Sequence, residues 1–102
     1  MARKVNWAYA AEEDLEAAAS YIHRDSPVYA TSFIDRALEA GRSLDEFAER
    51  GRMVPELGDS SIREIFVYSY RLVYRIEDDR ISILALIHGR RDFQKAWDEK
   101  NR

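Results

Sequence analysis

Residues 62–92 constrain the fold most, because they form the densest run of strand-forming residues in the chain. β-branched and aromatic residues dominate this stretch, and two polar breaks divide it. Glu77-Asp78-Asp79-Arg80 has the composition of a hairpin connection, whereas Tyr68-Ser69 predicts a tighter and less clearly marked turn. The sequence therefore predicts a three-stranded antiparallel meander, with strands at residues 62–67, 70–77 and 80–88.

The segment before the meander predicts one short strand and two helices that cover it. Residues 3–7 alternate between polar and apolar, which predicts a strand with Val5 and Trp7 facing inward. From Ala8 the period changes, and an apolar stripe at spacings of four, three and four predicts a helix ending near Arg24. The members of this stripe are Ala11, Leu15, Ala18 and Ile22.

A second helix is expected to begin at Pro27, with Ser26 as its cap, and to fade by Arg50-Gly51. Its apolar side contains Ala30, Phe33, Ile34, Ala37, Leu38, Gly41, Leu44 and Phe47. Gly41 on this stripe predicts a close approach, which we expect where the two helices cross as an antiparallel hairpin. Residues 51–61 predict a loop, and their apolar members Met53, Val54 and Leu57 are expected to pin it to the sheet edge.

The size and composition of the chain favour a single domain over residues 1–102, because 102 residues can build only one modest core. A hydrophobic content of 46% excludes disorder, and no apolar run approaches the roughly 20 residues that span a bilayer. The chain has no cysteine and no recognisable signal peptide, so a cytoplasmic location is expected. His23 and His88 match no zinc spacing, and neither a metal nor a cofactor is expected. His23 is interpreted as a helix-end residue.

The two faces of the meander differ in polarity. In its second strand Tyr70, Leu72, Tyr74 and Ile76 share one face, and Arg71, Val73, Arg75 and Glu77 share the other. Strict alternation in the third strand places Leu84, Leu86 and His88 on one face and leaves both faces apolar. A helix hairpin covers only one face of a four-stranded sheet, so we expect a partner to cover Leu84 and Leu86. The alternative is that Phe93 and Trp97, on a short terminal helix, fold back over this face.

Arginines give the meander its charge. Six arginines and no lysine lie in it, which is consistent with bidentate binding of carboxylate or phosphate or, more simply, with solubility. The net charge of −3 opposes binding to nucleic acid through bulk positive potential.

The order of these elements, together with particular motifs, resembles the ParE/RelE superfamily of bacterial toxins. The resemblance covers residues 4–92, and no single motif decides it. Its motifs are Trp7 before Ala11-x-x-Asp14-Leu15, Tyr21-Ile22, Ser26-Pro27-x-x-Ala30, Gly51-Arg52-x-Val54-Pro55-Glu56-Leu57, Arg63-Glu64-Ile65, residues 70–76 and Ile87-His88-Gly89-Arg90-Arg91-Asp92. The implied fold is α+β, with the short strand, the helix hairpin on one face of the sheet, and the meander.

The resemblance is nearest to the ParE branch and implies a toxin of a type II toxin-antitoxin system. Such a toxin is neutralised in a hetero-oligomer by a small ParD-like antitoxin with a DNA-binding domain. It inhibits DNA gyrase by binding, with no catalytic residue and no direct contact to nucleic acid. The residues expected to bind the antitoxin or the target are Arg63, Arg71, Val73, Arg75, Leu84, Leu86, His88, Arg90 and Arg91.

Two alternatives remain open at this point. A RelE-like toxin would cleave messenger RNA on the ribosome, with Arg63, Arg71 and Arg75 holding phosphate and His88 transferring a proton. A simpler interpretation pairs Arg71 and Arg75 with antitoxin carboxylates and makes His88 a structural residue hydrogen-bonded near Asp92. The other alternative is a non-toxic module that only binds an antitoxin.

Overall fold

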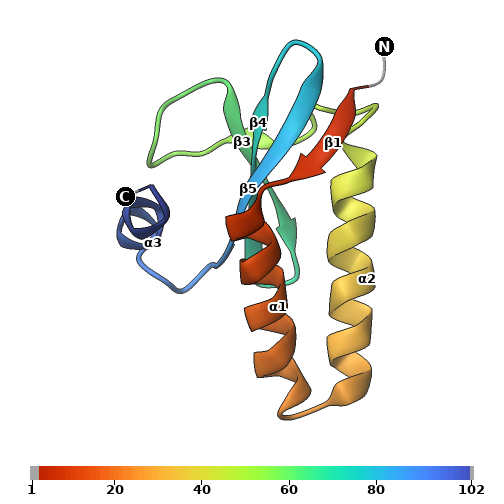
Figure 1. Ribbon diagram of the computed structural model, residues 1–102. Coiled ribbons are helices and arrows are strands. Elements are labelled where there is room, and N and C mark those ends of the chain that lie inside the picture. The colour runs from red at the N-terminus through yellow and green to blue at the C-terminus, as the bar shows by residue number, and fades with distance from the viewer. Residues whose placement is uncertain (1–2, 102) are drawn as a thin grey trace.

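The structure, a computed structural model, describes residues 3–101. These residues form an α+β fold in which a helix hairpin and a short terminal helix lie on opposite sides of one sheet (Figure 1). In chain order the elements are β1 (Lys4–Trp7), α1 (Tyr9–His23), α2 (Pro27–Ser43), β2 (Arg52–Met53), β3 (Ile62–Val67), β4 (Tyr70–Ile76), β5 (Arg80–His88) and α3 (Phe93–Lys100). None of the helices described is both long and apolar enough to cross a membrane.

The sheet has five strands in the order β1-β5-β4-β3-β2. The predicted meander β3-β4-β5 is confirmed, with the Tyr68-Ser69 turn between its first two strands. β1 joins this meander in parallel along β5, pairing Lys4 with Arg80 and Trp7 with Ile83. The sequence did not predict β2, a two-residue strand that pairs with Arg63 and Glu64 of β3.

The α1/α2 hairpin packs on one face of the sheet, as predicted. Ser26 accepts a hydrogen bond from the Tyr29 backbone N–H at 3.2 Å, and Pro27 opens α2. The predicted end of α2 at Arg50 is wrong, because the helix stops at Ser43, whose hydroxyl bonds to the Ala40 carbonyl. Serine competes for the helical backbone in this way. The chain then turns back, so that Leu44 is buried and Phe47 is 62% exposed.

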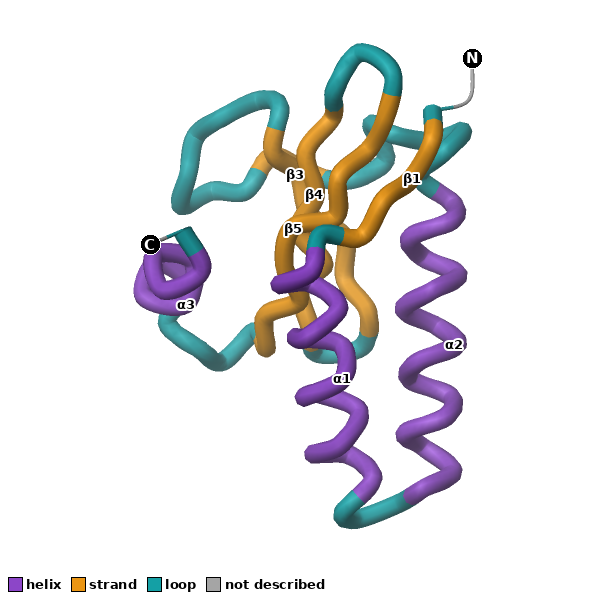
Figure 2. Tube along the Cα trace, viewed as in Figure 1, coloured by secondary structure: helices purple, strands orange, loops and turns teal. Residues whose placement is uncertain are grey.

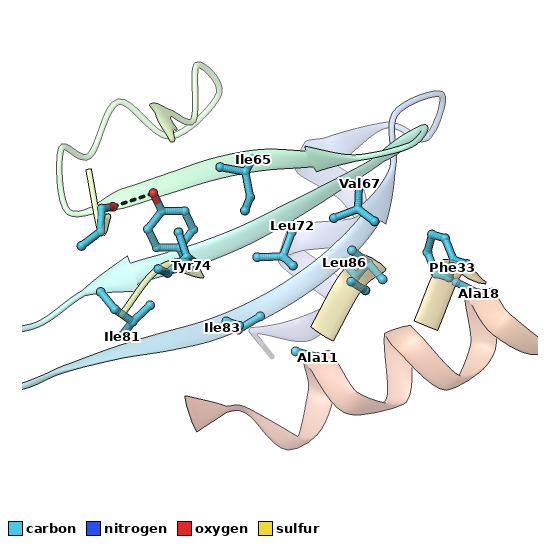
Figure 3. Close-up of a cluster of buried hydrophobic side chains, with 13 residues drawn as sticks. Ala11, Ala18, Phe33, Ile65, Val67, Leu72, Tyr74, Ile81, Ile83 and Leu86 are labelled. Atoms are coloured by element: carbon cyan, nitrogen blue, oxygen red, sulfur yellow. Dashed lines mark hydrogen bonds between the residues drawn. The ribbon is translucent and has the colours of Figure 1, made fainter. Parts of the chain in front are cut away.

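The main core lies between this hairpin and the sheet (Figure 3). Alanines at the contact let the helices approach closely, and branched and aromatic side chains of the strands fill the space. The buried members are Ala11, Ala18, Phe33, Ala37, Leu44, Ala48, Ile65, Val67, Leu72, Tyr74, Ile81, Ile83 and Leu86. Gly41 does mark a close approach, but to the sheet and not to α1. A Cβ there would lie 2.9 Å from Ile83 and 3.2 Å from Trp7.

A β-bulge in β5 changes which side chains face the helices. Val73 pairs with Ala85 and Tyr74 pairs with Ile83, which leaves Leu84 without a partner on β4. The alternation therefore shifts by one residue, so that Leu86 joins Ile83 in the helix-side core and is 4% exposed. The prediction that Leu84 and Leu86 share the face away from the hairpin was therefore wrong.

Asp14 on α1 stabilises β5 just beyond the bulge. β1 ends opposite Ile83, so within the described part of the chain the outer edge of β5 has no strand partner after that residue. The Asp14 carboxylate accepts the Leu86 N–H at 2.9 Å and also pairs with Lys100 at the end of α3. One half-buried carboxylate thus joins the helix hairpin, the sheet and α3.

We expect Asp14→Ala to lower the free energy of unfolding by about 1–2 kcal/mol, because it leaves the Leu86 N–H without an acceptor. Urea denaturation monitored by circular dichroism measures the loss. Asp14→Asn is the matched control, since its amide oxygen still accepts this bond and only the charge opposite Lys100 is lost. An equal loss in both variants would contradict a role for the Leu86 hydrogen bond.

α3 covers the second face of the sheet. Figure 2 shows it on the side opposite the hairpin, with the loop between β2 and β3 extending toward it. A second buried cluster forms there from Val54, Ile62, Val73, Ala85, Ile87, Phe93 and Ala96, with Leu57 and Trp97 against it. Our expectation that a partner covers this face was wrong, because the chain folds its own terminal helix over it.

Candidate functional site

Arg71 is the centre of a buried ion cluster on the α3 face of the sheet. Its Nε donates to Glu64 Oε1 at 2.5 Å, and its two terminal nitrogens donate to the two oxygens of Glu56 at 2.9 and 2.6 Å. Arg52 donates to the second oxygen of Glu64 at 2.7 Å. The Arg71 guanidinium also lies 4.3 Å from the centre of the Phe93 ring. Every charge in the cluster is therefore paired within the chain.

The positions of these groups follow from the register of the strands. Glu64 pairs with Val73 and Phe66 with Arg71, so Glu64 and Arg71 lie on the same face and near each other. The Glu64 side chain is fully buried and that of Arg71 is 9% exposed. A buried carboxylate requires such partners, because an unpaired charge in the interior is costly.

The cluster shifts the pKa values of its members. The hydrogen bond from Arg71 holds the pKa of Glu56 below its usual value of 4.5. The same bond raises the pKa of Arg71, and Glu64 adds to this increase. Both groups therefore remain charged throughout the neutral pH range, and the Arg71 charge is held by carboxylates and not offered to solvent.

A pH dependence of stability follows from the lowered pKa of Glu56. The stabilisation is fully present above 4.5, the usual value, and is lost as pH falls through the lower folded-state pKa. We expect the free energy of unfolding of Glu56→Gln to be about 1 kcal/mol lower than that of wild type at pH 7, a small effect because Glu56 is partly exposed, and the difference to shrink as pH falls below 4.5. Urea midpoints at several pH values measure this, and a constant difference would contradict it.

Arg63 lies on the other face and fixes the loop before β2. Its Nη1 donates to the Gly51 carbonyl at 2.8 Å, while its buried Nε has no hydrogen-bond partner among residues 3–101. The Gly51 N–H donates to the Tyr74 hydroxyl at 3.1 Å. That hydroxyl donates to the Ala48 carbonyl at 2.7 Å, the dashed line in Figure 3. A Cβ on Gly51 would meet the Glu64 carbonyl at 2.6 Å, so only glycine fits here.

The other predicted residues near the end of the sheet are more exposed. His88 Nδ1 accepts the Arg90 backbone N–H at 3.0 Å, and the imidazole meets the Tyr70 ring edge-on with centroids 5.0 Å apart. The expected bond near Asp92 was wrong, because Asp92 instead caps α3 through the Lys95 N–H. Arg91 pairs with Glu99 at 3.6 Å on the surface.

The structure does not bring the four residues of the nuclease alternative together. Arg71 and Arg75 lie on the α3 face, whereas Arg63 pairs with Tyr74 and His88 pairs with Tyr70, on the hairpin face. Tyr70 and Tyr74 are four residues apart, so Arg63 and His88 are separated by roughly 13 Å along the strand. Of the remaining predicted residues, Val73 is buried beneath α3, Leu84 is half-buried, and Arg75 and Arg90 are exposed.

Several residues of these sites were missed from the sequence. Glu64 stands on the inward face of an apolar strand, which is the signal that could have indicated a buried ion pair with Arg71. Glu56 and Phe93 are distant in sequence and carry no comparable signal. The sequence also showed no sign that two pairs of tyrosines lie close together. Tyr21 and Tyr29 flank the turn between α1 and α2, and Tyr68 and Tyr70 lie at the turn between β3 and β4.

Residues 5–93 match the sequence profile described as the ParE toxin of the type II toxin-antitoxin system parDE. The chain belongs to the ParE toxin family. The chain is also similar to Toxin RelE2 from Caulobacter vibrioides, which is 34% identical over 89 residues, covering 86% of this chain and 97% of the relative. The resemblance to the ParE/RelE superfamily is thereby confirmed.

Two solved structures share the fold of this ParE family member. The chromosomal ParDE toxin-antitoxin system from P. aeruginosa contains a chain with a TM-score of 0.70 and 20% identity, covering 84% of this chain and 95% of that one. The toxin-antitoxin complex RelBE2 from Mycobacterium tuberculosis contains a chain with a TM-score of 0.59 and 22% identity, and the match covers 86% of this chain and 99% of that one. Both confirm the predicted α+β class.

Proposed function

We propose that this ParE family member inhibits DNA gyrase by binding to it and is held inactive by a cognate antitoxin. The observation that carries the proposal is the neutralisation of Arg71, the central arginine of the sheet, by Glu56 and Glu64. A phosphate would have to displace two carboxylates from this arginine, one of them fully buried. The match to the ParE profile and the net charge of −3 support the same proposal.

A supercoiling assay tests the gyrase proposal. Increasing amounts of purified chain are added to gyrase and relaxed plasmid, and the concentration that halves supercoiling is measured. Inhibition should be relieved when the cognate antitoxin is added at equal concentration. Unchanged supercoiling at a large excess of the chain would contradict the proposal.

RNA cleavage on the ribosome is the second candidate, because the chain is 34% identical to a protein named Toxin RelE2. Primer extension on translated messages tests it, with His88→Ala and Arg75→Ala as variants that leave the buried cluster intact. New 5′ ends with wild type, reduced in both variants, would favour this activity over gyrase binding. Normal growth on expression of the chain alone would favour the non-toxic module.

A further inference from the structure

A cleft lined by aromatic side chains lies at the tip of the helix hairpin. The end of α1, the start of α2, the β3-β4 turn and the end of β5 enclose about 410 Å³. Its walls are mainly Tyr21, Tyr29, Phe33, Tyr68, Tyr70 and His88. All of these lie within the segment that matches the family. The cleft is formed by four separate parts of the chain, so the fold places these rings together.

The tyrosines at the mouth of the cleft contribute little to the core. Tyr21, Tyr29 and Tyr68 are 65%, 71% and 62% exposed, whereas Phe33 at its base is 2% exposed. The Phe33 ring contacts Tyr70 at 5.0 Å and Tyr68 at 6.2 Å between centroids, which gives the cleft a rigid floor. Exposed tyrosines over a fixed apolar floor are typical of the residues that dominate protein interfaces.

Tyr68 occupies a backbone conformation that does not favour tyrosine. Its φ of 53° lies in the left-handed region, in the two-residue turn between Val67 and Tyr70. Glycine, asparagine or aspartate is the ordinary residue at such a position, because a larger side chain is strained there. The tyrosine therefore makes the turn less stable than a glycine would, but it places a large ring over the cleft. Backbone strain of this kind concentrates at functional sites.

The rim of the cleft is cationic. The guanidinium of Arg24 lies 6.0 Å from the Tyr21 ring, and that of Arg36 lies 5.5 Å from the Tyr68 ring. No carboxylate lines the cleft among residues 3–101, whereas Glu12 and Glu16 line the neighbouring groove between α1 and α2. A complementary partner would therefore insert an apolar side chain between the tyrosines and place acidic residues beside the two arginines.

We propose that this cleft is the surface through which the toxin binds gyrase, and that its occupant is an acidic segment of gyrase anchored by an aromatic or aliphatic side chain. The inference rests on the proposed function. It is also consistent with the opposite face of the sheet, where α3 already covers Val73, Ala85 and Ile87. The tyrosines at the mouth of the cleft, by contrast, remain accessible in the folded chain.

Two tyrosine variants test the cleft. Tyr68→Gly removes the ring and relieves the strained turn, and Tyr29→Ala removes a side chain that is mostly exposed. We expect the double variant to need at least about tenfold more protein for half-inhibition of supercoiling, with a thermal midpoint no lower than that of wild type by more than a few degrees. Tyr9→Ala is the matched control, because Tyr9 is 75% exposed and lies outside the cleft.

A charge variant tests the rim separately. Arg36→Glu should weaken inhibition most strongly at low ionic strength, because salt then screens least the electrostatic repulsion between the new carboxylate and the acidic segment of gyrase. Arg42→Glu, on the same helix but away from the cleft, is the control and should inhibit like wild type. Equal weakening by both variants would contradict a specific role for the rim.

The outcomes separate the cleft from the proposed function. If wild-type protein does not inhibit gyrase, the proposed function fails. If wild type inhibits and the double tyrosine variant inhibits equally well, gyrase inhibition stands and the cleft proposal is overturned. Affinity for the cognate antitoxin is measured in parallel and should be unchanged. A tenfold loss of antitoxin affinity would assign the cleft to the antitoxin and would also overturn the proposal.

Discussion

Arg71→Met is expected to lower the free energy of unfolding by about 3–5 kcal/mol, because it leaves the buried carboxylate of Glu64 without its main partner. Methionine retains most of the length of the side chain and its contact with Phe93, so the effect isolates the lost charge and hydrogen bonds. Arg52 still pairs with Glu64 in this variant, but it is 57% exposed and contacts only one oxygen. Urea denaturation at pH 7 measures the change.

The double variant Arg71→Met with Glu64→Met is the control. It removes both buried charges together, so no buried carboxylate is left unpaired, and the partly exposed Glu56 can be solvated; we expect it to recover most of the lost stability. A double variant as unstable as Arg71→Met alone would show that packing around the arginine, and not its charge, is what the fold requires. Glu56→Ala gives a further comparison, because Glu56 is partly exposed and its loss leaves a guanidinium that solvent can reach.

Phe93→Ala should be comparably damaging, at about 3–5 kcal/mol. Phe93 is 3% exposed, stacks with Trp97 at 5.9 Å between centroids, and lies against the Arg71 guanidinium. Its loss leaves a cavity under α3 and removes the main contact that holds this helix on the sheet. We expect α3 to become sensitive to protease before the rest of the chain unfolds.

Lys95→Ala on the same helix is the matched control, because its side chain is exposed and alanine favours helix. Limited proteolysis followed by mass spectrometry locates the first cleavage sites in both variants. If Phe93→Ala is instead cleaved throughout the chain at the rate of global unfolding, the loss of Phe93 does not release α3 alone, which would contradict this prediction. Resistance equal to that of Lys95→Ala would contradict its importance for α3.

The sequence was sufficient for the elements whose pattern is local. The stripe from Ala11 to Ile22 predicted α1, the Ser26-Pro27 pair predicted the start of α2, and alternating apolar residues predicted the meander. The hairpin face of β4 was also predicted correctly, because Tyr70, Leu72, Tyr74 and Ile76 all contact the helix-side core.

The errors arose where distant groups override local pattern. Strict alternation in β5 could not reveal that Leu84 bulges, since the bulge is defined by the pairing of β5 with β4, a separate strand. The same shift places His88 on the hairpin face, away from Arg71. The role of α3 was also uncertain from sequence, because in eight residues of which half are charged there is little sign that Phe93, Ala96 and Trp97 form one apolar face.

The sequence indicated that the arginines on the sheet would bind carboxylates, but it could not show which carboxylates these are. Arg71 was expected to meet carboxylates from an antitoxin, and the carboxylates come from Glu56 and Glu64 of the same chain. That Arg75, Arg90 and Arg91 bind an antitoxin or a target stays a prediction. The aromatic cleft could not be predicted, because it depends on the hairpin tip lying against the β3-β4 turn.

The parallel pairing of β1 with β5 has a consequence for the order in which the protein can fold. The first strand of the chain can take its place only after residues 80–83 have been synthesised, and the Asp14 bond to Leu86 spans 72 residues. Contacts between such distant segments form late, because a long chain must first be closed into a loop. Until β5 has been made, the helix hairpin therefore lacks the strand to which Asp14 of α1 is hydrogen-bonded. The newly made toxin can reach its native shape only after residues 80–86 have been synthesised.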